Sequence, residues 1–302
     1  MIKDFKELIE KTQQGSVKKI VAVVAAHDEH TLDAVDLASK NNIAGSVLIG
    51  DGAKIKELKD KHGFQLKDAE IIEEKDDVLA AKKAVSMIKD GTANFLMKGK
   101  LQTSDLLREV VNKEHGLNKG RVMSHFGIFE IPGYHKLLVL TDGGMLPHPN
   151  LDEKAQILLN AVEVLHELGY DNPKVAAMAA AEVVNPKIPE SVDADLLKKM
   201  NLEGKIKGCI VEGPISFDLM FSPESAKIKG YESPVTGDTD VLLMPGMTSG
   251  NLLAKSFQYI AGAKMAGMIV GAAAPIVLVS RGASSEEKYF SMVLSAAAAT
   301  RG

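Results

Sequence analysis

Apolar and polar positions follow two different periods along the first third of the chain. Short runs rich in valine, isoleucine and leucine predict strands at 19–26, 45–51, 69–74 and 95–98, and helical patterns begin near Thr31, Lys54, Asp76 and Thr103. Such alternation is typical of βαβ units and a parallel sheet. The run VAVVAA is apolar at every position, as expected of a strand that is covered on both faces. The pattern therefore predicts an α/β fold.

The pattern changes between residues 121 and 142. This segment holds two strand-like stretches joined by Pro132 and Gly133, a pair more typical of a hairpin turn than of a crossover helix. Alternation then resumes, with helices predicted at 150–169, near 192–200 and at 249–265, and strands at 174–180, 206–213 and 240–246. We therefore expect a second α/β domain after the hairpin. The last strand, 275–280, and the last helix fit either domain.

Composition narrows the class of protein. The chain has 302 residues, of which 45% are hydrophobic, enough for two domains with buried cores. The formal net charge of -4 arises from interleaved acids and bases, so no basic face is predicted for nucleic acid or an anionic membrane. Cys209 is the single cysteine, which excludes an intramolecular disulfide, and the polar N-terminus lacks the apolar core of a signal peptide. These features predict a cytoplasmic protein with small-molecule partners.

The longest apolar stretch runs from 265 to 280. It has about 16 residues, fewer than the roughly 20 that a helix needs to span a bilayer, and it contains Pro275. We interpret it as the buried end of a helix followed by a core strand. No membrane anchor is predicted.

Candidate chemistry lies where the predicted strands end, because ligands of open α/β sheets bind at the carboxyl ends of the strands. Glycine beside a polar residue lets backbone N–H groups and helix N-termini approach an anion. The sequence has no G-x-G-x-x-G, P-loop or G-x-S-x-G motif, which argues against dinucleotide redox chemistry, P-loop phosphoryl transfer and α/β-hydrolase catalysis. An anion-binding cleft remains. The strand ends are His27-Asp28, Asp51-Gly52, Lys98-Gly99-Lys100, Asp142-Gly143-Gly144, Glu212-Gly213-Pro214, Pro245-Gly246 and Ser280-Arg281-Gly282.

The stretch from 97 to 111 has a structural and a functional interpretation. In the first, Thr103 or Ser104 caps an amphipathic helix whose solvent face carries Arg108. In the second, Lys98, Lys100 and Arg108 come together as a cationic phosphate clamp. The sequence alone leaves both open.

Other candidates also have structural interpretations. Asp142 is more typical of a turn than of a base, because Asp-Gly-Gly needs no other explanation. Cys209 lies within a predicted strand and is expected to be a small buried hydrophobe, and no histidines have metal-ligand spacing. Ser284 and Glu287 fit the S-x-x-E capping box, which explains the glutamate as part of a helix start.

Several stretches resemble the phosphate acetyl/butyryl transferase family over nearly the whole chain. They are NIAGSVLIGD, TSDLLR at 103–108, VLTDGGM at 139–145, VEGPISFDL at 211–219 and LLMPGMTSGN followed by VLVSRG at the end. VEGPISFDL and GAAAPIVLVSRG are more similar to the butyryl branch than to the acetyl branch. The resemblance implies reversible acyl transfer between coenzyme A and phosphate, with acyl-CoA and phosphate or acyl phosphate as partners, and neither a cofactor nor a metal. Coenzyme A is then a substrate.

The resemblance also implies an architecture. It predicts two α/β domains around a cleft, similar to isocitrate and isopropylmalate dehydrogenases, in a homo-oligomer. Because the C-terminal segment of the family returns to the first domain, we expect a discontinuous domain of residues 1–120 plus 270–302 and a second of residues 121–269.

Family site residues can be carried over by position. The catalytic serine and the phosphate-binding arginine fall on Ser280 and Arg281, and a second arginine falls on Arg108. The acid that assists the CoA thiol is an aspartate in acetyl transferases and Glu287 here, and Lys98 or Lys100 could replace a further arginine that has no counterpart. Four further residues are predicted to bind substrate: Thr103, Ser104, Asp142 and Gly282.

The expected mechanism is direct transfer in a ternary complex, since no histidine is predicted beside Ser280 to make it a nucleophile. Three alternatives remain: a phosphate acetyltransferase, a non-catalytic acyl-CoA or phosphate sensor, and a decarboxylating dehydrogenase of the same architecture. The last requires a set of metal-binding aspartates, which the sequence does not display.

Overall fold

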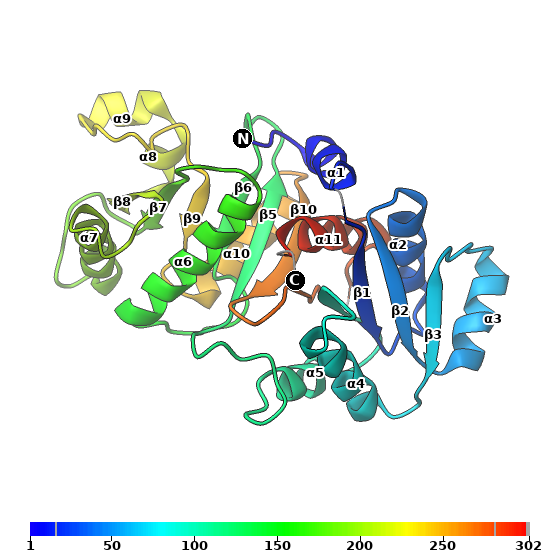
Figure 1. The fold of residues 1–302 in the computed structure, drawn as a ribbon. Coiled ribbons are helices and arrows are strands. Elements are labelled where there is room, and N and C mark those ends of the chain that lie inside the picture. Colours follow the sequence, from blue (N-terminus) through cyan, green and yellow to red (C-terminus); the bar gives the residue numbers. More distant parts are fainter. Residues whose placement is uncertain (16, 281, 300–302) are drawn as a thin grey trace. The chain divides into compact units, whose positions relative to one another are not determined.

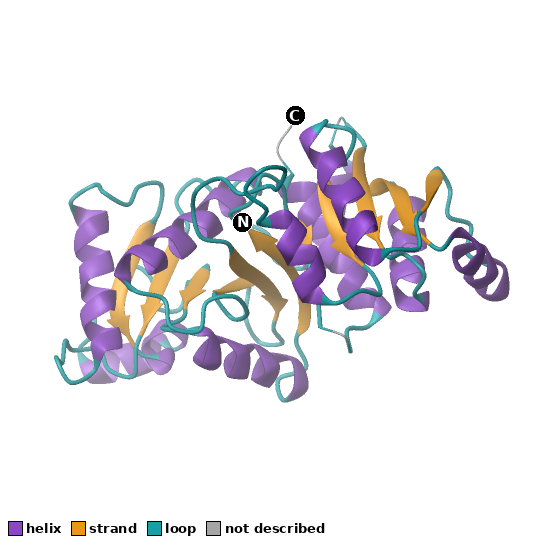
Figure 2. Ribbon diagram, turned by 90° about the horizontal axis from the view of Figure 1, so that it is seen from below, coloured by secondary structure: helices purple, strands orange, loops and turns teal. Residues whose placement is uncertain are grey.

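The computed structural model describes residues 1–15, 17–280 and 282–299. It is a mixed α/β protein, as the alternating pattern predicts (Figure 1). The chain forms two compact units. The first unit consists of Ile2–Arg121 together with the chain from Met265 onward, and the second of Val122–Lys264. In each unit the strands are flanked by helices (Figure 2).

The first unit is built on strands in the order β3-β2-β1-β4-β11-β10. The first five of these strands are parallel to one another, and β10 is antiparallel to β11. Residues of β1 from Val21 onward are buried, as the uniformly apolar run predicts for a strand covered on both faces. Their bounds are Lys19–Val24 (β1), Ala44–Gly50 (β2), Ala69–Glu73 (β3), Phe95–Lys98 (β4), Lys264–Val270 (β10) and Ile276–Val277 (β11).

Helices cover both faces of this sheet (Figure 1). Helices α4 and α5 pack against each other, while α1 and α2 both pack against α11. Phe5 of α1 stacks on Phe290 of α11 with ring centroids 4.2 Å apart. The bounds are Phe5–Gln13 (α1), Glu29–Lys40 (α2), Gly52–His62 (α3), Asp77–Lys89 (α4), Thr103–Val110 (α5) and Ser285–Ala298 (α11).

The second unit has strands in the order β5-β6-β9-β7-β8. Strands β5 and β6 are antiparallel, which confirms the hairpin predicted around Pro132 and Gly133, and the remaining neighbours are parallel. The strands are Ser124–Glu130 (β5), Leu138–Thr141 (β6), Lys174–Met178 (β7), Ile210–Ile215 (β8) and Val241–Leu243 (β9). The helices are Leu151–Glu167 (α6), Pro189–Leu202 (α7), Phe217–Phe221 (α8), Pro223–Lys229 (α9) and Met247–Tyr259 (α10).

Several elements differ from the prediction. Residues 264–270, expected to end a helix, form strand β10, because α10 stops before Gly262, whose φ of 68° breaks the helix. Strand β11 has two residues where six were predicted at 275–280. The short helices α8 and α9 were not predicted at all.

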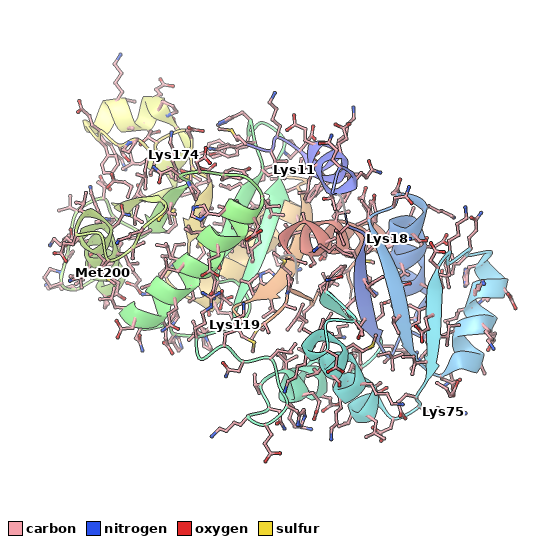
Figure 3. All side chains as sticks on the ribbon, viewed as in Figure 1. Lys11, Lys18, Lys75, Lys119, Lys174 and Met200 are labelled. Carbon is pink, nitrogen blue, oxygen red and sulfur yellow. The ribbon has the colours of Figure 1, made fainter. Side chains whose placement is uncertain are left out.

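The described part of the chain contains no helix that is both long enough and apolar enough to cross a membrane. Charged side chains instead populate the surface, and the exposed Lys18, Lys75 and Lys119 are labelled in Figure 3.

A buried lysine joins two strands of the second unit. Lys136, which precedes β6, is only 1% exposed, and its Nζ lies 2.6 Å from Asp238 and 2.7 Å from Asp240, which precede β9. Burial opposes ionisation of Asp238, but hydrogen bonds from Lys136, Lys174 and His135 outweigh it and hold the pKa of this carboxyl well below its usual range. The network fixes the start of β6 beside the start of β9.

We expect Lys136→Met to lower the free energy of unfolding by about 3–5 kcal/mol, because it leaves the buried carboxylate of Asp240 without its cation. The control is Lys18→Met, which breaks an exposed pair with Asp68 at 2.9 Å and should cost less than about 1 kcal/mol. Denaturant titration of both variants measures the difference. Equal losses would contradict the assignment of Lys136 to a buried network.

Candidate active site

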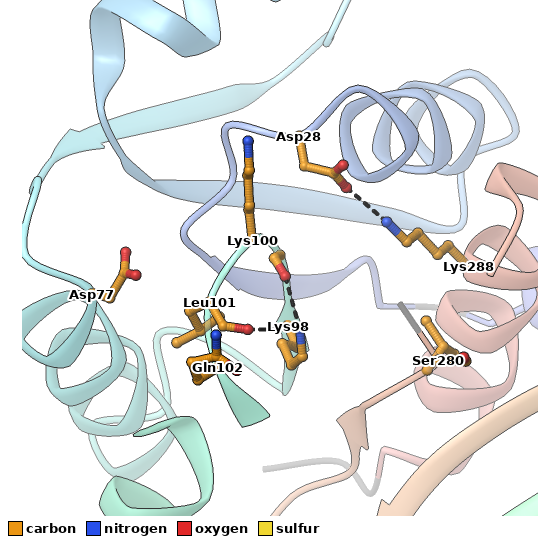
Figure 4. Close-up of a pocket in the computed structure, with 10 residues that line it drawn as sticks. Asp28, Asp77, Lys98, Lys100, Leu101, Gln102, Ser280 and Lys288 are labelled. Atoms are coloured by element: carbon orange, nitrogen blue, oxygen red, sulfur yellow. Dashed lines mark hydrogen bonds and ion pairs between the residues drawn. The ribbon is translucent and has the colours of Figure 1, made fainter. Parts of the chain in front are cut away.

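A cavity of about 450 Å³ lies in the first unit, where β1, β4 and β11 end (Figure 4). Because these three strands are parallel neighbours, the residues that follow them meet at one edge of the sheet. The structure thus brings together three of the polar strand ends that the sequence predicts. The lining residues are Asp28, Asp77, Lys98, Gly99, Lys100, Leu101, Gln102, Val279, Ser280 and Lys288.

The loop after β4 is tied to the end of β1. The backbone N–H of Gly99 donates to the carbonyl oxygen of Val24 at 2.8 Å, and that of Lys100 donates to Ala25 at 2.9 Å. A Cβ on Gly99 would lie 2.6 Å from the Val24 oxygen and closer still to that of Ala25. Only glycine therefore allows this approach, which places the loop directly at the cavity.

Two lysines of this loop line the cavity differently. Lys98 is half-buried, and its Nζ donates to the carbonyl oxygens of Gly99 at 3.1 Å and Leu101 at 2.9 Å, which stiffens the loop. Lys100 is exposed, so its ammonium is accessible to a ligand. In Figure 4, Lys98 lies between Asp77 and Ser280 in the view.

Ser280 lies in the segment between β11 and α11 and is exposed on the cavity. Its carbonyl oxygen accepts the N–H of Ala283 at 3.0 Å, which closes a turn. Arg281, the predicted partner of Ser280, lies outside the described residues. Gly282 is exposed, and nothing lies within 4 Å of where its Cβ would be, so space alone does not require glycine there.

The far wall of the cavity carries an ion pair. Nζ of Lys288, in α11, lies 2.7 Å from Oδ2 of Asp28, the N-cap of α2. Burial opposes ionisation of Asp28, but hydrogen bonds from Lys288 and Thr31 outweigh it and lower the pKa of this carboxyl. Asp77 at the start of α4 adds a second carboxylate.

The described lining therefore holds three lysines against two aspartates. Such an excess of cations, with a serine hydroxyl beside it, suits a phosphate or another small anion. No group of three or more His, Cys, Asp or Glu among the described residues is placed to hold a metal ion.

Sequence reasoning missed Asp28, Asp77 and Lys288 as cavity residues, although His27-Asp28 was among the predicted strand ends. One feature of the sequence could have pointed to Lys288: it is a cation in the first turn of a predicted helix, where the helix dipole disfavours positive charge.

The first turn of α5 corrects one expectation. Its N-cap is Gln102, without a side-chain capping bond, so neither Thr103 nor Ser104 caps the helix; both lie inside its first turn. Arg108 is exposed, as the solvent-face interpretation predicts, and its Nη1 lies 3.4 Å from Asp105. Thr103, Ser104 and Arg108 do not line this cavity. Of the three cations in the predicted clamp, the cavity therefore brings together Lys98 and Lys100 but not Arg108.

The predicted helix start at Ser284 is confirmed. Its Oγ accepts the backbone N–H of Glu287 at 3.1 Å, which is the serine half of the capping box. The carbonyl oxygen of Glu287 accepts a hydrogen bond from Ser291 Oγ at 2.7 Å. Glu287 does not line the cavity described above, and its part in catalysis stays a prediction.

Asp142 belongs to the second unit and is buried. Its carboxylate accepts backbone N–H groups of His125, Gly144, Met145 and Leu146 at 2.7–3.1 Å. These contacts organise the loop after β6, which is the turn role that Asp-Gly-Gly predicts.

Cys209 is buried, with 6% of its surface exposed. Burial raises the pKa of its thiol to about 11, so little thiolate exists near neutral pH. The prediction that Cys209 is buried is confirmed.

Comparison with known proteins shows which family the chain belongs to. Residues 77–296 match the phosphate acetyl/butaryl transferase family. The chain belongs to the phosphate acetyl/butyryl transferase family. It is 44% identical to phosphate butyryltransferase of Clostridium acetobutylicum over 98% of both chains. It is also 39% identical to phosphate acetyltransferase of Thermotoga maritima, over 97% of this chain and 99% of that relative.

Solved structures agree with this family. A branched-chain phosphotransacylase from Enterococcus faecalis superposes with a TM-score of 0.84 at 31% identity, covering 94% of this chain and 100% of the other. A putative 4-hydroxythreonine-4-phosphate dehydrogenase from Salmonella typhimurium shares the fold alone, with a TM-score of 0.58 at 14% identity, covering 94% of this chain and 100% of that one. The predicted dehydrogenase-like α/β fold is therefore confirmed.

Proposed function

We propose that this chain is a phosphate acyltransferase that moves a short-chain acyl group, preferentially butyryl, between coenzyme A and inorganic phosphate. The observation that carries the proposal is the likeness to the Clostridium acetobutylicum phosphate butyryltransferase, which extends over 98% of both chains. The lysine-lined cavity beside Ser280 supports it, because phosphate and acyl phosphate are anions.

Phosphate binding requires cations with accessible donors. Lys100 offers an ammonium at the mouth of the cavity, and Lys98 keeps the loop that carries it in place. Arg281 and Arg108 complete the proposed clamp, since an arginine fork matches two oxygens of one phosphate. The helix N-termini of α2 and α4 near Asp28 and Asp77 add favourable partial charge for the anion.

The acyl group moves by direct attack. In the direction toward acyl-CoA, the CoA sulfur attacks the acyl phosphate carbonyl, the thiol proton leaves to solvent or to the departing phosphate, and the bond from carbonyl carbon to phosphate oxygen breaks. Negative charge grows on the carbonyl oxygen in the tetrahedral species, and the Ser280 hydroxyl donates a hydrogen bond to it. No described histidine lines the cavity to deprotonate Ser280, which favours direct transfer over an acyl-enzyme.

A phosphate acetyltransferase is the second candidate function. It is favoured by the relative of that name from Thermotoga maritima, whose identity to this chain is only 5 percentage points below that of the butyryltransferase (44% against 39%). The two functions differ in the acyl group alone.

We place the enzyme in the cytoplasm, in accord with its single buried cysteine, and in a homo-oligomer. The second unit offers apolar surface for such contacts on and just after α10, where Leu252, Tyr259 and Ile260 are 64%, 79% and 85% exposed.

The proposed function is tested by mixing butyryl-CoA with phosphate and following the free thiol. We expect phosphate-dependent thiol release, faster with butyryl-CoA than with acetyl-CoA, propionyl-CoA or branched acyl-CoA. Preference for acetyl-CoA would favour the second candidate. No phosphate-dependent release from any of the four would rule out both.

Glu287→Gln distinguishes an orienting or catalytic acid from a helix residue. The ordinary pKa of a glutamate, about 4.3, lies some four units below that of a thiol near 8.5, so we propose that Glu287 orients the CoA thiol and does not remove its proton. We expect a fall in kcat of at least about tenfold with unchanged thermal stability. Ser222→Ala is the control, because it removes the N-cap hydroxyl of α9, which does not line the cavity, and should cost about 1 kcal/mol of stability with little effect on kcat. Loss of stability with kcat retained in Glu287→Gln would assign Glu287 to the helix alone.

A further inference from the structure

Lys288 occupies a position that its own helix disfavours. It lies in the first turn of α11, where the partial positive charge of the helix N-terminus repels a cation, and only 8% of its surface is exposed. Lysine is almost never buried unless it is paired. Contacts with another part of the fold must therefore offset the cost of burying this ammonium at a helix N-terminus.

That role is a link between two helix starts. The Lys288 ammonium lies 2.7 Å from Asp28 Oδ2 (Figure 4). It also lies 3.0 Å from Thr31 Oγ1, in the first turn of α2. Asp28 also accepts the Thr31 backbone N–H at 3.0 Å as the N-cap of α2. A second contact, 3.2 Å between His30 Nδ1 and Ser285 Oγ, joins the same two turns.

The link between the starts of α2 and α11 helps to set the position of Ser280. Residues 278–280 follow β11, which pairs with β4, and residues 282–284 lead into the first turn of α11. One turn further along α11, Ser291 Oγ accepts the N–H of Gly267 in β10 at 2.9 Å. Together with the Ser285–His30 contact, Lys288 thus holds the start of α11 on α2, and of these two residues of α11 it is Lys288 that lines the cavity.

We infer that Lys288 is a positioning residue for acyl transfer. Paired with Asp28, it holds the start of α11 so that Ser280 and Glu287 keep the geometry that the reacting carbonyl and thiol require. The inference rests on the proposed function for its kinetic consequence.

Phosphate binding is not the role of Lys288. Its charge is balanced by Asp28 at hydrogen-bond distance, so the pair presents little net charge to an anion. The exposed Lys100 lines the same cavity with no described carboxylate in an ion pair with it, and it is the better ligand.

The test is a double-mutant cycle of Lys288→Met and Asp28→Asn. Methionine keeps the length of the apolar stem, and asparagine remains a good N-cap for α2, so each change removes chiefly one charge. We expect each to lower kcat by about tenfold to a hundredfold, since small displacements of reacting groups cost that much. KM for acyl-CoA and for phosphate should change by less than about threefold, and the double variant should be no worse than the poorer single one. Lys288→Arg, which keeps the charge, should recover most of kcat.

The matched control is Lys40→Met. Lys40 pairs with Asp36 at 2.5 Å at the other end of α2, and this pair does not line the cavity. The control should leave kcat unchanged. An equal fall in kcat in Lys40→Met would overturn the inference, as would wild-type kcat in Asp28→Asn. A raised KM for phosphate with kcat unchanged in Lys288→Met would make Lys288 a ligand instead.

A readout without activity separates this inference from the proposed function. Amide hydrogen exchange of residues 278–280 and 282–284, measured without substrates, should be faster in Lys288→Met than in the wild type and unchanged in Lys40→Met. Unchanged exchange in Lys288→Met would overturn the positioning role. Failure of the wild type to release thiol would instead overturn the proposed function while leaving the exchange result to stand.

Discussion

Parallel pairing of β4 with both β1 and β11 is the constraint on which the candidate site depends. Because Met97 pairs with Val23 on one side and Val277 on the other, the three strands run out of the sheet at the same level. Gly99 then passes so close to the end of β1 that any side chain would collide with its carbonyl oxygens. Backbone geometry alone therefore places Lys98, Lys100 and Ser280 around one cavity.

The three lysines that line the cavity differ in how their ammonium groups are held, and this difference supports a different role for each. Lys98 is held by backbone carbonyl oxygens and Lys288 by Asp28, so both are part of the wall. Lys100 is exposed and lacks such a described partner carboxylate. A wall of immobilised cations with one accessible ammonium suits an anion, because little rearrangement is needed to bind one, and that is the condition for transition-state stabilisation by a preorganised site.

Much of this arrangement could be predicted from the sequence, because strand and helix periods are local properties. The parallel strands and the polar residues at their ends followed from such patterns. Residues 264–270 were misassigned because a continuous apolar run fits a buried helix end as well as a strand, and only the pairing with β11 distinguishes them. Lys288 could not be placed in the site, because its partner Asp28 is 260 residues away in sequence. Arg281, the arginine that the resemblance favours, lies outside the described residues.

The central claim is that the cavity at the ends of β1, β4 and β11 is the phosphate site, and a calorimetric titration of inorganic phosphate tests it most directly. Lys100→Met should weaken phosphate binding about tenfold, equivalent to about 1.4 kcal/mol, because it removes one charged donor. Lys54→Met, which removes a 62% exposed lysine side chain beside Asp51 and away from the cavity, should leave the affinity unchanged. Equal phosphate affinity in the wild type and Lys100→Met would contradict the account.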